Sequence, residues 1–399
     1  MRYTLFLPTL TLLIAGILCT TTIAQTPVSA SVQEAIDRIT ALNGRHTLTP
    51  DNTIRAITFT DGSSLNAAMF DLFAQQSDLE TLHIDNYREL NDAMVAKLTG
   101  LTKLRSLTLT NSGITDAAIR TIADSFPNLT VLNVSSNTQL TDAATREIAR
   151  LQQLEDLRVR FCDFSEFGML NIARLPKLRV LDIRANMRVG DGGMRTLAAL
   201  PSLTHLMHRS PVTDFGIEAL TAARSLQHLE VEDFAITGQS GQHIRRMENL
   251  NSLIIFRCEN FDSQGLLDLE GMKLTRLTLR SLPIEDSAME VFSGLTTLRR
   301  LFLQELPSVT DAGMANLAHL KDLAELDIWD TPIGDKSLET IAKLPALRIL
   351  WLRETNITDA GLELLLTAPS LQTVRLVGNA NVTPAMIQKL RDAEKFRVE

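Results

Sequence analysis

The sequence predicts an α/β solenoid: a horseshoe with a parallel β-sheet on its concave face and α-helices on its convex face. The pattern L-x-x-L-x-L, with Ile, Val, Phe or Met in some places, starts fourteen times between Ile54 and Leu371 of the 399-residue chain. These starts are about 24.4 residues apart on average, and such a period indicates stacked repeats. Within each unit, an alternation of period two is followed by helical spacing, which predicts one strand and one helix per repeat. Stacked units share one continuous core, so the chain need not divide into separate globular domains.

Residues 1–24 have the features of a secretory signal peptide. Arg2 gives a basic start, residues 5–18 are apolar, and Thr22-Ile23-Ala24 ends the segment with a small residue. The apolar stretch is shorter than the ~20 residues that a membrane-spanning helix needs. We expect cleavage after Ala24 and export to a periplasmic or extracellular space, without stable membrane insertion afterwards. A lipid anchor at Cys19 and an uncleaved membrane tether are the alternatives.

Residues 25–53 are expected to form a cap, since an uncovered first repeat would expose the core. An amphipathic helix is predicted over residues 31–42, with a capping box at Ser31-x-x-Glu34 and a stop at Asn43-Gly44. A hairpin through Pro50-Asp51-Asn52 then leads into the first repeat strand.

The repeat array is assigned to residues 54–394, followed by a tail at 395–399. In one typical unit, Leu107 and Leu109 alternate with Thr108, as in a half-buried strand, before helical spacing begins at Ile114. Thr115-Asp116 comes between the two, and we expect Thr to cap the helix and Asp to complement its dipole. The same threonine recurs at Thr141, Thr213, Thr310, Thr358 and Thr383. A calcium ladder of the aspartates is the alternative, but the units supply no second carboxylate at fixed spacing.

The unit Leu298-Arg-Arg-Leu301-Phe-Leu303, continued by Val309-Thr-Asp-Ala-Gly-Met314, resembles the leucine-rich repeat family. It is similar to the cysteine-containing type, L-x-x-L-x-L-x-x-C/N-x-x-I-T-D-x-G-L-x-x-L, which is familiar from F-box proteins. The resemblance covers about residues 54–394 and implies the horseshoe fold. It also offers a substrate-recognition subunit of a ligase-like complex as one alternative function, although no F-box-like helical segment precedes the repeats. We expect an exported, bacterial-type member without an F-box.

Two positions of the repeat depart from a uniform pattern. The C/N position holds asparagine in some units and apolar residues in others, so hydrogen bonding along that edge is expected to be uneven: Asn137, Asn186 and Asn379 against Pro211, Phe234, Leu282 and Leu306. The unit at Leu203 is irregular, because His208 occupies an inward-facing apolar position.

Cys162 and Cys258 occupy this same C/N position, four repeats apart. Neighbouring strands are ~4.8 Å apart, which separates the two cysteines by roughly 19 Å, while a disulfide needs Cα atoms within about 7 Å. We expect two free, buried thiols.

The outward residues of successive strands form two columns across the concave face. One follows the second leucine of each unit and includes Phe302, Asp327, Trp351 and Arg375; the other lies two residues further on. Trp and Arg most often anchor interfaces, and both tryptophans of the chain fall in these columns. The principal binding patch is predicted to comprise Phe256, Arg280, Phe302, Asp327, Trp329, Trp351, Arg353 and Arg375. Mutual stacking that only stabilises the sheet is the alternative.

A second patch for an anionic partner is predicted at four arginines of earlier strands: Arg158, Arg160, Arg184 and Arg209. Neighbouring carboxylates offer lateral salt bridges as an equal alternative: Asp156, Asp182, Glu230 and Glu232.

The sequence contains no pattern of a nucleophilic, phosphate-binding or zinc-dependent catalytic site. Zinc binding by His205, His228 and Glu230 is disfavoured, since no third histidine aligns with them. Lys and Arg number 39 against 47 Asp and Glu, which argues against a nucleic-acid partner. We expect a monomeric, non-catalytic scaffold without cofactor or metal that binds an extracytoplasmic protein or peptide. Binding of a carbohydrate or cell-envelope polymer is the alternative.

Overall fold

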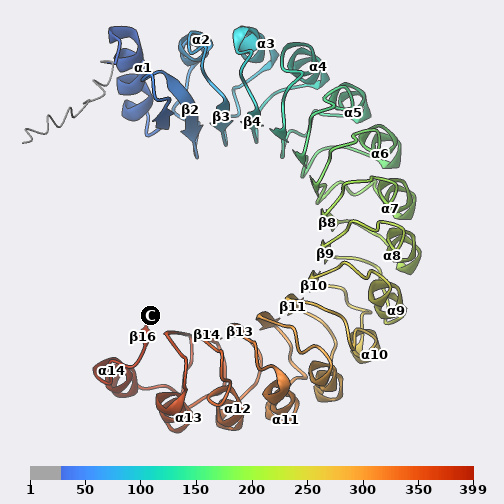
Figure 1. Cartoon of the computed structure of the whole chain (residues 1–399), viewed down its shortest axis with the longest axis vertical. Helices are drawn as coiled ribbons and strands as arrows, with labels where there is room; N and C mark the ends of the chain where they lie inside the picture. The colour runs from blue at the N-terminus through green and yellow to red at the C-terminus, as the bar shows by residue number, and fades with distance from the viewer. Residues whose placement is uncertain (1–27) are drawn as a thin grey trace, which may run out of the picture.

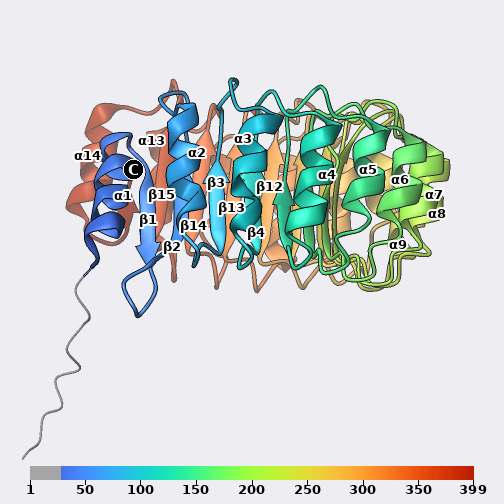
Figure 2. The same ribbon diagram turned by 90° about the horizontal axis from the view of Figure 1, so that it is seen from above.

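The computed structural model describes residues 28–399, which form an open horseshoe with the strands lining its inner side (Figure 1). The predicted solenoid is therefore confirmed. Seen from above, the repeats stay at one level, so the arc is close to planar (Figure 2). The predicted leader, residues 1–24, lies outside the described residues. Within residues 28–399, no helix is both long and apolar enough to cross a bilayer.

One sheet of sixteen strands, in sequence order, runs through the described residues. β1 pairs antiparallel with β2, and every later neighbour is parallel. The strands are β1 (Arg45–Leu48), β2 (Ile54–Phe59), β3 (Thr81–Ile84), β4 (Ser106–Leu109), β5 (Val131–Asn133), β6 (Asp156–Arg158), β7 (Val180–Asp182), β8 (His205–Arg209), β9 (His228–Glu232), β10 (Ser252–Phe256), β11 (Arg276–Arg280), β12 (Arg300–Gln304), β13 (Glu325–Trp329), β14 (Ile349–Arg353), β15 (Thr373–Val377) and β16 (Arg397–Val398).

The convex side carries short helices, several of which begin or continue as 3₁₀ turns. The α-helices are α1 (Ala30–Ala41), α2 (Ala67–Ala74), α3 (Asp92–Ala96), α4 (Asp116–Ser125), α5 (Asp142–Ile148), α6 (Glu166–Ile172), α7 (Asp191–Leu197), α8 (Asp214–Leu220), α9 (Gln239–Arg245), α10 (Ser263–Leu267), α11 (Asp311–Met314), α12 (Asp335–Ile341), α13 (Asp359–Leu364) and α14 (Pro384–Asp392). The 3₁₀ segments are η1 (Lys97–Gly100), η2 (Asp286–Ser293), η3 (Ala315–His319) and η4 (Leu365–Thr367).

The N-terminal cap consists of α1 and the β1–β2 hairpin, as expected, but its capping residue differs from the prediction. Ser29 is extended and accepts a hydrogen bond from the amide of Val32, so the helix begins at Ala30. Ser31 lies inside the first turn, and the predicted capping box at Ser31 is wrong. The stop is confirmed, because Asn43 has a φ of 60° and turns the chain out of the helix.

The C-terminal end is closed by α14 and β16. Thr383 caps α14, and Pro384 occupies the first turn, where its missing amide hydrogen costs no bond. The 395–399 tail joins the sheet, since Thr373 and Val374 of β15 pair with Arg397 and Val398.

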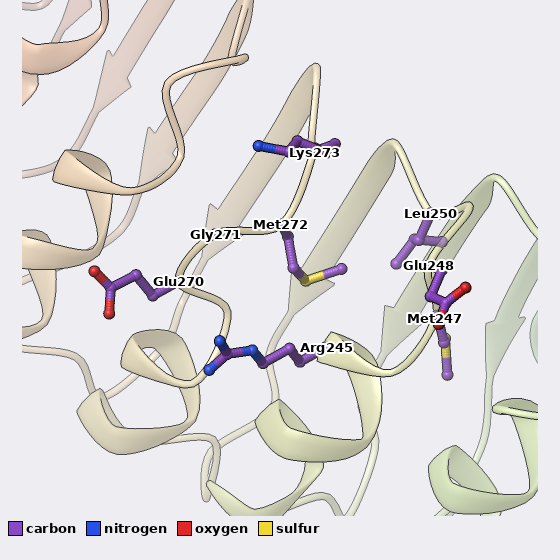
Figure 3. A pocket seen from close by; sticks show the side chains of 8 residues that line it. All are labelled: Arg245, Met247, Glu248, Leu250, Glu270, Gly271, Met272 and Lys273. Atoms are coloured by element: carbon purple, nitrogen blue, oxygen red, sulfur yellow. The ribbon is translucent and has the colours of Figure 1, made fainter.

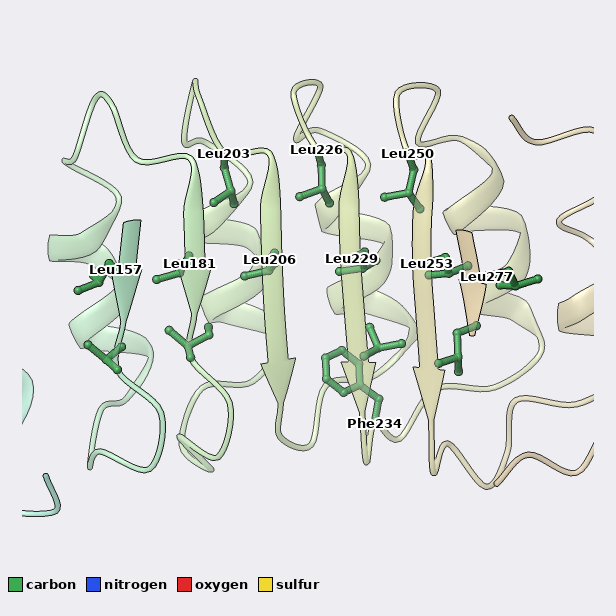
Figure 4. Packing of buried hydrophobic residues seen from close by; sticks show 14 of the residues in the cluster. Leu157, Leu181, Leu203, Leu206, Leu226, Leu229, Phe234, Leu250, Leu253 and Leu277 are labelled. Atoms are coloured by element: carbon green, nitrogen blue, oxygen red, sulfur yellow. The ribbon is translucent and has the colours of Figure 1, made fainter. Parts of the chain in front are cut away.

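The core is a file of leucines between the sheet and the helices. Leu181, Leu206, Leu229 and Leu253 come from successive strands and are 0% exposed. Figure 4 shows them at the same height, each packed against the equivalent leucine of the next repeat. Burial of such a side chain contributes ~1.5–3 kcal/mol, so the repetition itself supplies the main stabilisation.

Threonine caps the repeat helices as predicted, and the following aspartate has an additional role. Thr358 caps α13 by accepting from the amide of Ala360. Asp335, the first residue of the preceding α12, accepts from the Thr358 amide at 2.8 Å and from its hydroxyl at 2.7 Å. Equivalent bonds join Asp92 to Thr115, Asp116 to Thr141, Asp191 to Thr213, Asp214 to Thr237, Asp286 to Thr310 and Asp359 to Thr383. Each of these carboxylates couples its own helix to the start of the next one.

Asparagine at the C/N position forms the buried bonds that the uneven pattern predicts. Asn137 is 0% exposed. Its side-chain amide donates to the carbonyls of Leu109 and Val134, and its oxygen accepts from the amide and the hydroxyl of Ser112. In contrast, Phe234 and Leu306 at this position have no side-chain polar atom to offer, so the edge is unevenly bonded.

Cys162 and Cys258, the two cysteines within residues 28–399, are free and buried, as expected. Burial raises the pKa of Cys162 and that of Cys258 to about 12. The thiols are therefore protonated at neutral pH and unsuited to act as nucleophiles.

The irregular unit at Leu203 is built around His208. This side chain is 0% exposed and lies edge-on to Phe234, at 5.2 Å between ring centroids. Its Nε2 lies 3.1 Å from the carbonyl of Val189 and 2.8 Å from the hydroxyl of Ser210, while its Nδ1 has no partner among the described residues. Burial lowers the pKa of His208 to about 3, so the ring is neutral in the folded protein.

His208 is expected to make the protein acid-sensitive. Below an unfolded-state pKa of about 6.5 the unfolded chain binds a proton that the folded chain rejects, so stability falls as pH drops from there toward 3. At pH 5 the loss amounts to about 2 kcal/mol. His208→Leu should remove this contribution and leave that of His228, whose pKa burial lowers to about 4. Its acid shift, measured as urea midpoints at pH 5 and pH 8, should therefore be smaller than that of the wild type. The exposed His319→Leu serves as control. An equal acid shift in the wild type and His208→Leu would contradict the assignment.

Candidate functional site

The predicted columns lie in register on the concave face. Phe302 pairs with Asp327, and Asp327 pairs with Trp351, which pairs with Arg375. In the second column, Trp329 pairs with Arg353. Trp329 and Trp351 are therefore diagonal neighbours on adjacent strands, as predicted. The sequence thus located these residues correctly on one surface.

Aromatic rings and arginines alternate along this surface. The guanidinium carbon of Arg280 lies 4.3 Å from the ring centroid of Phe256 and 4.7 Å from that of Trp329. Arg353 lies 5.1 Å from Trp329 and 5.4 Å from Trp351. Arg375 continues the series at 4.3 Å from Trp351. These six residues form the cation–π ladder, which spans β10 to β15.

Carboxylates fix the arginines of the cation–π ladder in place. Arg353 donates two hydrogen bonds to Asp327, which is only 2% exposed. Arg280 pairs with Glu305 at 2.7 Å, and this bond lowers the pKa of Glu305. Arg375 pairs with Glu399 in the C-terminal tail. The rings are thus held in a defined arrangement before any partner arrives.

All eight predicted patch residues lie on β10 to β15, but their surroundings differ. Asp327 is buried and serves as the acceptor for Arg353. Trp329, Trp351 and Phe302 are half-buried and face the hollow of the horseshoe. The mutual stacking that we named as the alternative is present. It makes the surface rigid, and a rigid aromatic surface is also what a binding site needs.

A third column belongs to the same face and escaped the sequence analysis. It consists of the residue before the second leucine, and in register it runs from His228 through Ser252 and Arg276 to Arg300 and Glu325. Arg276 lies 5.1 Å over the ring of Phe302. The 24-residue period could have located this column too, if the residue before the second leucine of each repeat had been aligned in the same way.

The second predicted patch is largely neutralised. Arg158 pairs with Asp156 at 3.0 Å, Arg184 with Asp182 and Glu230 at 2.7 Å each, and Arg209 with Asp233 at 2.6 Å. Arg160 has no ion pair within the described part of the chain and lies 6.0 Å from the ring of Phe161. The lateral salt bridges that we gave as the alternative thus hold Arg158 and Arg184. The close partner of Arg209 is Asp233, which that alternative did not include, while Glu232 lies 3.9 Å away.

His205 and His228 stack with their ring centroids 5.4 Å apart. Each Nδ1 is near a hydroxyl, that of Thr204 or Ser252, and burial lowers the pKa of His228 to about 4. Glu230 is engaged with Arg184. Residues 28–399 contain no group of three or more His, Cys, Asp or Glu placed to hold a metal ion.

A pocket of about 220 Å³ lies between the loop that leads from α9 to β10 and the loop that leads from α10 to β11. Figure 3 shows its charged side chains, Arg245, Glu248, Glu270 and Lys273, spread around the rim rather than converging on a point. This arrangement has no feature of a catalytic centre.

Comparisons with known proteins agree with the fold. Residues 145–390 match the family model described as "Leucine-rich repeat region". An internalin of Listeria monocytogenes is similar in structure, with a TM-score of 0.53 and 22% identity over 88% of this chain and 98% of the internalin. The yeast Rad7 and Elc1 complex gives a TM-score of 0.56 and 17% identity, over 80% of this chain and 85% of the matched one. At these identities the similarity concerns the fold alone.

Among curated proteins, a Caenorhabditis elegans protein, EEED8.10, is 27% identical over 292 residues and is provisionally named as RNA-binding. The match covers 68% of this chain but only 39% of the relative. The chain therefore spans about two fifths of the length of that protein.

Proposed function

Because the chain belongs to the leucine-rich repeat family, we propose that it is a non-catalytic scaffold that binds a protein or peptide on its concave face. The fold supports a protein-interaction scaffold in general. The observation that carries the specific proposal is the cation–π ladder on β10 to β15. It places both tryptophans of the chain on the inner surface, in a fixed arrangement.

The ordered aromatic rings and arginines of the cation–π ladder favour a polypeptide as the ligand. Aromatic rings and ion-paired arginines supply apolar area and hydrogen bonds with little loss of side-chain entropy, because they are already ordered. Trp and Arg in the centre of an interface are the residues whose truncation costs most. The N-terminal strands, with Thr108 and Asn133 on the same face, offer no comparable anchors.

We propose an extracytoplasmic partner, since residues 1–24 have the pattern of a cleaved leader. Nucleic acid is not proposed as a ligand. The net charge is −8, and most arginines on the inner face are already paired with carboxylates. The RNA-binding name of the C. elegans relative belongs to a protein of which the match covers a minor part.

The proposal is tested by capture on the immobilised full chain. A membrane-free extract of the source is passed over it, the retained protein is purified, and its binding is measured by calorimetry against the full chain. The proposal predicts saturable binding of that protein and no signal when the chain is applied to a glycan array or to RNA. Binding to glycans alone would replace the proposal by the carbohydrate alternative.

A further inference from the structure

On β10 to β15, two arginines of the concave face lack the carboxylate partner that the other three have. On β10 to β15, Arg280, Arg353 and Arg375 are each in an ion pair. Arg276 on β11 and Arg300 on β12 have none within residues 28–399. They are neighbours in the register, on strands ~4.8 Å apart, so two like charges lie side by side.

Hydrogen-bond donors around this pair are also unused. The Nε of Arg276, the hydroxyl of Thr278 and the indole Nε1 of Trp351 are buried and have no partner among the described residues. Thr278 lies on the same face of β11 as Arg276. In the register, Thr278 is followed on successive strands by Phe302, Asp327 and Trp351. A buried donor without an acceptor costs ~1–3 kcal/mol. The free chain therefore carries an unfavourable arrangement at this place.

The positive charges of Arg276 and Arg300 destabilise each other. Burial, and after it the charge of Arg300, lowers the pKa of Arg276. Glu325 follows Arg300 in the register without forming an ion pair with it. Arg276, Arg300 and Glu325 together carry a net charge of +1, which one negative charge balances. Glu230, the other carboxylate that acts on Arg276, is already paired with Arg184. A phosphate dianion or a polyanion would bring more negative charge than the site neutralises.

We propose that Arg276 and Arg300 together bind a single carboxylate of the protein partner, supplied by an Asp or Glu side chain or by a chain terminus. Guanidinium groups bind carboxylates through paired, charge-assisted hydrogen bonds. The ring of Phe302, over which Arg276 lies, supplies the apolar floor of the site. This inference rests on the proposed function and specifies the partner as an acidic peptide segment.

The test is a selection of random linear peptides on the full wild-type chain. Peptides retained by wild type but lost on the Trp329→Ala, Trp351→Ala variant are expected to be enriched in Asp or Glu next to apolar residues. A selected peptide is then titrated while the fluorescence of Trp329 and Trp351 is followed. Arg276→Gln with Arg300→Gln should weaken its binding at least about 30-fold. Glu→Gln in the peptide should cause a similar loss on the wild type and little further loss on the double variant.

The control is Arg245→Gln with Arg246→Gln, which removes the same charge from two exposed arginines at the end of α9. It should bind the peptide as the wild type does, and thermal melts should show that both double variants are folded. Tryptophan-dependent peptides without acidic residues would overturn the carboxylate site and leave the proposed function standing. Selection of no peptide that depends on the tryptophans would contradict the proposed function, and the carboxylate site with it. Equal preference for a phosphoserine in place of the acidic residue would also overturn the single-charge argument.

Discussion

Replacing Trp329 and Trp351 together by alanine is expected to weaken binding of the captured partner by about 100-fold or more, because central Trp anchors each contribute ~2 kcal/mol or more. The same change removes four cation–π contacts and should cost about 2–4 kcal/mol of stability while leaving the chain folded. Each tryptophan stacks on arginines at a half-exposed site, where a cation–π contact contributes ~0.5–1 kcal/mol. Calorimetry with the partner gives the first quantity and urea unfolding the second.

The matched control removes two aromatic rings from the outer side. Phe167 on α6 and Phe215 on α8 are 76% and 71% exposed. Phe167→Ala with Phe215→Ala should leave both partner binding and stability unchanged. If the tryptophan variant lost binding only through unfolding, the cation–π ladder would be a stabilising device of the sheet, as the alternative from the sequence holds.

Asn137→Ala is expected to lower the free energy of unfolding by about 3–5 kcal/mol, since several buried groups lose their partners at once. The carbonyls of Leu109 and Val134 and the amide of Ser112 would remain buried with nothing to replace the asparagine side chain. Because repeats contact only their neighbours, the weakness would be local to the units around β4 and β5. Urea unfolding and amide hydrogen exchange measure both effects.

Asn356→Ala provides the comparison, since Asn356 is exposed and its side chain has no hydrogen bond among the described residues. It should unfold as the wild type does. Partner binding under native conditions should survive Asn137→Ala, because β10 to β15 lie several repeats away. An unchanged urea midpoint for Asn137→Ala would show that this asparagine does not join the repeats as described.

Periodicity explains why so much of the fold and of the surface could be predicted. A leucine at a fixed position in each unit places the strands in register, and the residues between the leucines then face the same way. The neighbours of Trp351 and the separation of Cys162 from Cys258 follow from the position of each residue within its repeat and from the number of repeats between them. The N-terminal cap is not part of the repeat, so the period could not locate the start of its helix. Ser29 and Ser31 both suit a helix start, and the structure starts the helix after Ser29.

Other ion pairs could not be predicted in the same way, because their carboxylates lie outside the columns. Glu305 follows β12 with a φ of 52°, and this left-handed turn brings its carboxylate beside Arg280. Glu399 reaches Arg375 only because the tail adds a strand to the sheet. The unpaired state of Arg276 and Arg300 likewise becomes visible only when every other pairing is known.

We propose that the C-terminal strands, rather than the whole inner face, hold the partner. Site-specific incorporation of a photo-crosslinking phenylalanine analogue at Val377 or at Thr60 tests it most directly. Both positions are exposed and belong to the second column. Thr60 directly follows β2 and Val377 is the last residue of β15, so they lie at opposite ends of the arc. After irradiation in the native source, we expect a covalent adduct with the partner at Val377 and none at Thr60. An adduct at Thr60 without one at Val377 would contradict it.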